Sequence, residues 1–142
     1  MGRIIGLDLG TRTCGIALSD PMGIIASGYE NYRFKENDFE DALNHIKDIC
    51  QKMSIEKIVI GFPKHMNGDL GEKCELVLSF KKRLEEETKL EVITVDERWT
   101  TVIATKRLLE ADLSRKKRKE VIDKMAAVVI LQSYLDHRGG KK

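Results

Sequence analysis

The hydrophobic positions in the first third of the chain follow the period of β-strands. Arg3–Leu9 is a short apolar run that ends at Gly10-Thr11-Arg12, a sequence typical of a tight turn. Cys14–Ser19 is a second apolar run, and Ile24–Tyr32 alternates after the turn sequence Asp20-Pro21-Met22-Gly23. These patterns predict three consecutive strands joined by tight turns, an arrangement that forms an antiparallel meander.

The rest of the chain is dominated by the helical period. Asn37 followed by Glu40 resembles a capping box, and apolar residues then recur at helical spacing from Phe39 to Met53. The pattern beyond this helix predicts, in order, a strand over Lys57–Gly61, a loop up to Gly71, a helix over about Glu72–Glu87, a strand over Leu90–Val95, and helices over Val102–Glu110 and about Lys116–Leu135.

This order of elements predicts an α/β fold. We expect a mixed five-stranded sheet, with three antiparallel strands followed by parallel strands, flanked by helices. The length of 142 residues corresponds to one domain, and 42% hydrophobic with 34% charged residues are enough for a core and a soluble surface. We therefore predict a single domain over residues 1–138 and a flexible tail at Gly139–Lys142.

The cysteines and histidines lack the spacing of zinc and redox motifs. Cys14, Cys50 and Cys74 are far apart, contain no Cys-x-x-Cys pair, and are expected to be reduced core thiols. Of the three histidines, only His65 lies in a loop near the expected chemistry. The chain also has no apolar run of about 18 residues and no signal-peptide pattern, so we expect a cytoplasmic protein that does not cross a membrane.

Charge is unevenly distributed along the chain, although the net charge is only +2. From Arg98 to Lys142 there are 12 Lys or Arg residues against 5 Asp or Glu, whereas the first 97 residues hold 13 against 18. The run Arg115-Lys116-Lys117-Arg118-Lys119 opens the last predicted helix, where the helix dipole disfavours positive charge. The run is a candidate phosphate-binding segment, and the alternative is an ordinary solvated turn.

Asp8 is a charged residue inside the first apolar strand. Burying a carboxylate there is costly unless it is paired, hydrogen-bonded or bound to a metal. One explanation is structural, with donors in the Gly10–Thr13 turn holding the carboxylate. The other, which we favour, is a ligand-binding or catalytic role.

Two further acids, Asp96 and Glu97, directly follow the last predicted strand. The carboxyl ends of strands are where α/β sheets place their sites. Because strand side chains alternate between faces, only one of the two acids can share the face of Val95, and the sequence leaves open which one binds a ligand. The alternative is a loop in which Thr100 or Thr101 only caps the next helix.

Asp123 is the third candidate acid, on the last predicted helix. Its helical neighbours Ala126, Ala127 and Ile130 are small or apolar, and small residues let a helix approach a sheet closely. Such an approach brings a short carboxylate near the ends of the strands. The alternative is an exposed Asp on an ordinary amphipathic helix.

Together these carboxylates form an oxygen-rich set on three separate elements. Hard divalent cations such as Mg²⁺ prefer oxygen ligands of this kind. Two such ions can activate a water and stabilise the leaving oxygen of a phosphodiester. The set therefore indicates a hydrolase that cleaves phosphodiester bonds, and the cation also bridges the acidic site to a polyanionic substrate.

Four ordered segments resemble the YqgF family, also called RuvX, of pre-16S ribosomal RNA nucleases and Holliday-junction resolvases. They are GLDLGTRTCGIALSD (residues 6–20), GFPKHMNG (61–68), DERWTT (96–101) and DKMAAVVILQ (123–132), and the resemblance spans nearly the whole chain. It implies an RNase H-like fold, a bacterial cytoplasmic origin, and cleavage of structured nucleic acid with Mg²⁺ or Mn²⁺. Position by position, the acidic residues of the family fall on Asp8, Glu97 and Asp123.

These observations favour a metal-dependent endonuclease that processes the 5′ end of pre-16S ribosomal RNA in ribosome biogenesis. Its catalytic and metal-binding residues would be Asp8, Glu97 and Asp123. Contacts to the phosphate backbone are expected from Arg12, Arg98, Arg107 and the run from Arg115 to Lys119.

Two alternatives stay open. One is a resolvase of branched DNA, which would act as a homodimer rather than a monomer to make two symmetric cuts. The other is a nucleic-acid-binding module without catalytic activity. A phosphotransferase of the actin-like class, suggested by Leu7–Thr11, is disfavoured because that architecture needs two such domains.

Overall fold

The computed structural model describes residues 2–62, 71–96 and 115–139, without the side chains of residues 71–73, 96, 115–124, 138 and 139. The described elements are, in order, β1 (Arg3–Leu9), β2 (Thr13–Ser19), β3 (Ala26–Arg33), α1 (Phe39–Lys52), β4 (Ile55–Phe62), α2 (Gly71–Thr88), β5 (Glu91–Asp96) and α4 (Arg115–Gly139). The predicted helix at Val102–Glu110 and the loop over residues 63–70 lie outside the described residues.

The described strands form one mixed sheet in the order β3-β2-β1-β4-β5. β1 pairs antiparallel with β2, and β2 with β3, whereas β1 with β4 and β4 with β5 are parallel pairs. This confirms the predicted mixed five-stranded sheet. The carboxyl ends of β1, β4 and β5 consequently lie at the same end of the sheet.

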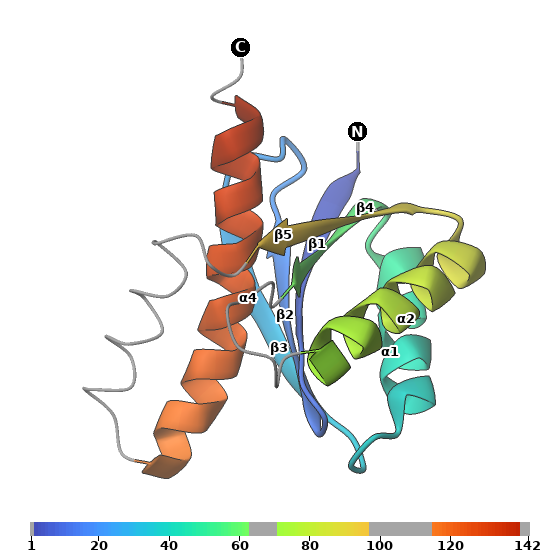
Figure 1. The fold of residues 1–142 in the computed structure, drawn as a ribbon. Coiled ribbons are helices and arrows are strands. Elements are labelled where there is room, and N and C mark those ends of the chain that lie inside the picture. Colours follow the sequence, from blue (N-terminus) through green and yellow to red (C-terminus); the bar gives the residue numbers. More distant parts are fainter. Residues whose placement is uncertain (1, 63–70, 97–114, 140–142) are drawn as a thin grey trace.

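Helices cover both faces of the sheet, with α1 and α2 on one face and α4 on the other (Figure 1). On the α1/α2 face, Ile5 and Leu7 of β1 belong to the larger apolar cluster. On the α4 face, Ile4 packs in a second cluster with Ala127 and Leu131. β1 is therefore buried on both faces, as expected for a central strand that has parallel and antiparallel neighbours.

The amino-terminal cap of α1 differs from the predicted capping box. Asp38, not Asn37, is the N-cap, and its carboxylate accepts a hydrogen bond from the backbone N–H of Asp41 at 3.3 Å. Asn37 instead has a positive φ of 65°, and its backbone N–H donates to the carbonyl of Thr11 at 2.7 Å. The cap moved by one residue because this tertiary contact with the β1–β2 turn fixes the backbone of Asn37.

The third strand begins at Ala26, two residues later than the predicted start at Ile24. The carboxylate of Asp20 accepts hydrogen bonds from the backbone N–H groups of Ile24 and Ile25, at 2.7 and 2.9 Å. Because these two N–H groups donate to the Asp20 side chain, they do not form hydrogen bonds between strands. The turn therefore extends to Ile25, and the strand begins after it. The same bonds hold the pKa of Asp20 below its usual value.

The terminal helix is longer than predicted, since α4 continues to Gly139 rather than ending near Leu135. Its described inner face carries the predicted small and apolar residues, and Ala126, Ala127 and Ile130 are all buried. Neither α4 nor any other described helix combines the length and apolar character needed to span a membrane.

The cysteines only partly match the expectation of core thiols. Cys14 and Cys50 are buried, as predicted, and none of the three cysteines forms a disulfide. The prediction was wrong for Cys74, which α2 leaves half-buried. Burial raises the pKa of the Cys50 thiol to about 11, so this thiol stays protonated at neutral pH.

Candidate functional site

Asp8 lies near the carboxyl end of β1, on the face of the sheet that α4 covers. Leu7 and Leu9 belong to the α1/α2 cluster, whereas Ile4 belongs to the α4 cluster. Side chains alternate along a strand, so Asp8 shares the face of Ile4 and Gly6. It is half-buried between two buried leucines. A carboxylate at this position remains within reach of an ion that enters from the end of the sheet.

α4 runs antiparallel to β1. Near the start of β1, Tyr134 accepts a hydrogen bond from Lys57, which pairs in register with Ile4. Further along β1, a Cβ on Gly6 would lie 2.6 Å from Cβ of Leu131 and 3.2 Å from the carbonyl oxygen of Ala127. Moving toward the carboxyl end of β1 therefore means moving toward the amino-terminal end of α4 (Figure 1).

Because α4 runs antiparallel to β1, positions 8 and 123 lie at the same level, meaning at a similar height along the axis of β1. Asp8 is two residues beyond Gly6, a rise of about 6.7 Å along a strand. Asp123 is one helical turn before Ala127, a rise of about 6 Å along a helix. The backbone of Asp123 thus lies toward the carboxyl end of β1, while its side chain lies outside the described atoms.

The end of β5 lies at the same level as Asp8, two strands from β1 on the side of β4. Leu7 pairs with Ile60 on β4, so the next position on β4, opposite Asp8, is Gly61. Gly61 in turn pairs with Val95 on β5. Val95 is buried in the α4 cluster at the level of Asp8, and β5 lies two strand spacings, or about 9.6 Å, from β1. Asp96 is the last residue of β5, and Glu97 lies outside the described residues.

Glycine flanks Asp8 on both neighbouring strands, a feature that the sequence analysis missed. Asp8 pairs with Gly15 on β2, and Gly61 occupies the matching position on β4. Beyond Gly15, the same row continues to Asn31 on β3. Neither glycine contributes a side chain, so the Asp8 carboxylate has no side-chain neighbour in its row on β2 or β4. The signal was invisible in the sequence because it depends on the register of three strand pairs.

The predicted basic residues are only partly described. Arg12, in the β1–β2 turn, is 63% exposed and forms an ion pair with Glu36 at 3.2 Å. The run Arg115–Lys119 opens α4, as predicted, and reaches about 12 Å beyond the level of Asp123. The side chains of this run lie outside the described atoms, as do all of Arg98 and Arg107.

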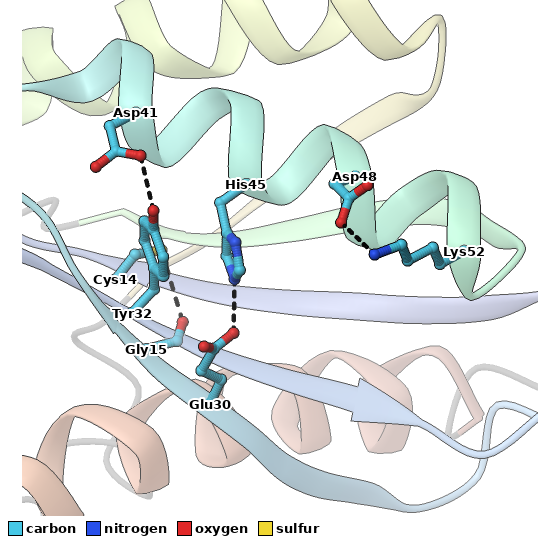
Figure 2. A network of polar contacts seen from close by, with 8 residues as sticks. All are labelled: Cys14, Gly15, Glu30, Tyr32, Asp41, His45, Asp48 and Lys52. Atoms are coloured by element: carbon cyan, nitrogen blue, oxygen red, sulfur yellow. Dashed lines mark hydrogen bonds and ion pairs between the residues drawn. The ribbon is translucent and has the colours of Figure 1, made fainter.

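The described histidine His45 lies close to the level of Asp8 but on the opposite face of the sheet. His45 Nε2 lies 2.6 Å from Glu30 Oε1, and the Tyr32 ring stacks on the imidazole with centroids 3.7 Å apart. The Tyr32 hydroxyl donates to Asp41 at 2.7 Å, which completes a network between β3 and α1 on the face opposite α4 (Figure 2). This network, also absent from the sequence analysis, joins the edge strand to the helix layer. His65 lies outside the described residues.

Among the side chains that the structure describes, no three His, Cys, Asp or Glu residues are grouped as in a metal site. Only Asp8 of the predicted acidic set belongs to those side chains, so the convergence of the three carboxylates stays a prediction. The backbone nevertheless places position 8 and the end of β5 at one end of the sheet and directs the amino-terminal part of α4 toward that end.

Comparison with known protein families identifies the family of the chain. The family model described as "RuvX: Holliday junction resolvase" matches residues 2–137. The chain belongs to the RuvX family. This confirms the resemblance to YqgF, the other name of the family, and makes the chain a member of a class of enzymes that cleave phosphodiester bonds.

Two relatives of the RuvX chain are similar over almost their whole length. A Geobacillus sp. (strain WCH70) protein named "Putative pre-16S rRNA nuclease" is 51% identical over 136 residues, which is 96% of this chain and 99% of the relative. A protein of the same name from Clostridium botulinum (strain Hall) is 52% identical over 134 residues, 94% of this chain and 96% of the relative.

Solved structures confirm the RNase H-like fold of this RuvX member. T. thermophilus RuvC in complex with a Holliday junction substrate matches with a TM-score of 0.65 at 13% identity, covering 99% of this chain and 97% of RuvC. The fowlpox virus Holliday junction resolvase matches with a TM-score of 0.56 at 13% identity, covering 96% and 99%. At such low identity, the match concerns the fold alone.

Proposed function

We propose that this RuvX chain is a Mg²⁺- or Mn²⁺-dependent endonuclease that acts on structured RNA, with the 5′ end of pre-16S ribosomal RNA as its substrate. The observation that supports the proposal is that α4 runs antiparallel to β1, which directs position 123 toward the end of the sheet where position 8 and the end of β5 lie. The names of the two relatives support the choice of substrate.

The chemistry of the donor set fits a hard divalent cation. Asp8 supplies carboxylate oxygens at a half-buried position, and its neighbours on β2 and β4 are glycines without side chains that could compete for an ion. We propose Asp8, Glu97 and Asp123 as the residues that hold the cation. When bound, the cation polarises the phosphodiester and supplies an activated water as the nucleophile.

The alternation of β5 favours Glu97 over Asp96 as the second ligand. Val95 packs in the α4 cluster and Val92 in the α1/α2 cluster, so odd positions of β5 belong to the face of Asp8. Position 96 is even and therefore belongs to the α1/α2 face. Position 97 would return to the α4 face if the same alternation continued, and the family resemblance assigns the ligand there as well.

The basic residues are proposed to hold the substrate backbone. Arg12 and the start of α4 lie toward the same end of the molecule as Asp8. We assign backbone contacts to Arg12, Arg98, Arg107, Arg115, Lys116, Lys117, Arg118 and Lys119. These positive charges attract the phosphates, while the cation prevents repulsion between the phosphates and the carboxylates.

The substitution Asp8→Asn tests the proposal. Cleavage of a pre-16S RNA fragment with Mg²⁺ should fall by more than about 100-fold, because even outer-shell partners of metal ligands are worth 10–100-fold. The control is Asp48→Asn, since Asp48 is an exposed acid on α1 that pairs only locally with Lys52. Asp48→Asn should retain full activity, and an equally active Asp8→Asn enzyme would refute the assignment.

A resolvase of branched DNA is the second candidate, because the description of the family model names this activity. The same carboxylates would serve, but two symmetric cuts require a dimer. Parallel assays of one preparation on a four-way DNA junction and on pre-16S RNA decide between the two. Preferred RNA cleavage by a monomer supports our proposal, and paired cuts by a dimer support the resolvase. Metal-dependent cleavage of either substrate excludes a binding module without activity.

We also propose a cytoplasmic location. Ribosomal precursor RNA lies in the cytoplasm of the bacteria in which the two relatives occur. Fractionation of cells that produce the tagged chain should recover it with the ribosomal precursors.

A further inference from the structure

Asn31 shares a row of the sheet with Asp8. In the antiparallel ladder, Asp8 is paired with Gly15 and Gly15 with Asn31. Directly opposed residues of antiparallel strands point to the same face, so Asn31 belongs to the face that α4 covers. Because Gly15 has no side chain, Asp8 and Asn31 are the only side chains of this row on β1, β2 and β3. Their backbones are two strand spacings apart, about 9.6 Å.

The two neighbours of Asn31 on β3, Glu30 and Tyr32, point to the opposite face of the sheet. Glu30 contacts His45 and Tyr32 donates to Asp41, both on α1 (Figure 2). These two polar side chains therefore have partners within the fold. The face on which Asn31 lies instead packs against α4, whose approach is close enough to require glycine at position 6.

The amide oxygen of Asn31 is buried and makes no hydrogen bond. It is the single buried side-chain oxygen or nitrogen without a partner among the described residues. Leaving a buried acceptor unsatisfied costs about 1–3 kcal/mol, so such groups in native proteins usually have a functional or structural reason. Among the described residues no group donates to this oxygen, so it is available to a donor from a ligand.

We propose that Asn31 is a positioning residue of the nuclease site, whose amide oxygen accepts a hydrogen bond from the hydration shell of the cation held at Asp8. The inference rests on the proposed function. A phosphate oxygen could not satisfy this group, since both are acceptors. Mg²⁺ keeps several of its waters in protein sites, and a hydrated ion can span a gap that is too wide for one ion bound directly by both residues.

The substitution Asn31→Leu separates this role from a structural one. Leucine has a similar volume and no polar atom, so removing the orphaned acceptor should leave the Tm unchanged or raise it. Affinity for Mn²⁺, measured by calorimetry on the full chain without nucleic acid, should fall about 10-fold or more. Asn31→Asp keeps an acceptor oxygen and should bind Mn²⁺ at least as well as the natural chain.

The matched control is Asn44→Leu, the same change at an exposed position of α1. It should alter neither Tm nor Mn²⁺ affinity. The inference is overturned if Asn31→Leu binds Mn²⁺ normally, or if its loss of affinity accompanies a loss of several degrees in Tm. A normal Mn²⁺ affinity combined with weaker RNA binding would also overturn it, because Asn31 would then contact the ribose 2′-hydroxyl.

Asp8→Asn in the same calorimetry distinguishes the two levels of the proposal. If Asp8→Asn abolishes Mn²⁺ binding and Asn31→Leu does not weaken it, only the role of Asn31 fails. If Asp8→Asn binds Mn²⁺ normally, the proposed site itself fails.

Discussion

Tyr32 shows how one side chain ties the edge strand of the sheet to a helix. Its hydroxyl donates to Asp41 at 2.7 Å, and its ring stacks on His45. The hydrogen bond to Asp41 raises the pKa of Tyr32 above its usual value of 10.0, because only the protonated phenol can donate. A group with a raised pKa in the fold stabilises the protein below its unfolded pKa and loses that contribution as the pH rises through the folded pKa.

The substitution Tyr32→Phe tests this linkage. It keeps the ring and removes the hydroxyl, so at pH 8 the variant should unfold at a lower urea concentration than the natural chain. As the pH rises above 10.0 and through the raised pKa of Tyr32 in the folded chain, the difference between the two midpoints should shrink. Tyr29→Phe is the control, because Tyr29 is 45% exposed on the same strand. A difference that stays constant with pH would contradict the linkage.

At the scale of elements, the close contact between α4 and β1 depends on Gly6. A Cβ at this position would meet Cβ of Leu131 at 2.6 Å and the backbone of Ala127 at 3.2 Å, so α4 would have to move away. The same helix carries Asp123 toward the level of Asp8. The packing of one glycine therefore affects both the stability of the fold and the geometry of the proposed site.

We expect Gly6→Ala to lower the free energy of unfolding by about 1–3 kcal/mol, the usual cost of overpacking a core. Nuclease activity should fall as well in the fraction that remains folded, because positions 8 and 123 move apart. Urea denaturation and cleavage of pre-16S RNA measure the two effects. Gly28→Ala, at an exposed position of β3, should affect neither quantity substantially. Normal stability of Gly6→Ala would show that α4 packs less closely than described.

At the scale of the whole molecule, charge and topology are coupled. The basic carboxyl-terminal part of the sequence begins α4 with Arg115–Lys119, and the antiparallel course of α4 carries that run past the level of Asp8. Positive charge thus lies toward the same end of the molecule as the proposed acidic site. This arrangement suits a polyanionic substrate that is held by its backbone and cleaved at a bound cation.

Replacing the five basic residues of this run by Gln should weaken RNA binding and flatten its salt dependence. Each lost phosphate contact changes the slope of log K against log salt by about 0.7 to 0.9. Filter binding from 50 to 300 mM KCl measures the slope. Every protein compared also carries Asp8→Asn, so that the RNA is not cleaved during the measurement. The control replaces Lys81 and Lys82 of α2, on the opposite layer. Equal slopes for the run variant and the natural chain would rule out a backbone clamp.

The sequence by itself determined the elements, their order and the family of this protein. Each helix or strand leaves a local period, such as the buried face of α1 from Ala42 to Cys50, that depends only on residues a few positions apart. The ordered segments likewise indicated the RuvX family, and a charge inside the first apolar strand drew attention to Asp8. The described strands and helices agree with those predictions to within a few residues at their ends.

Only the tertiary structure decided where long-range contacts override local patterns. The contact between Asn37 and Thr11 moved the cap of α1 to Asp38, and Asp20 delayed the start of β3. The row from Asp8 through Gly15 to Asn31 also required the structure, because strand register depends on pairing between segments that are distant in sequence. For the same physical reason, the sequence could propose three acids as a site, but it took the direction of α4 across the sheet to bring positions 8 and 123 to one level.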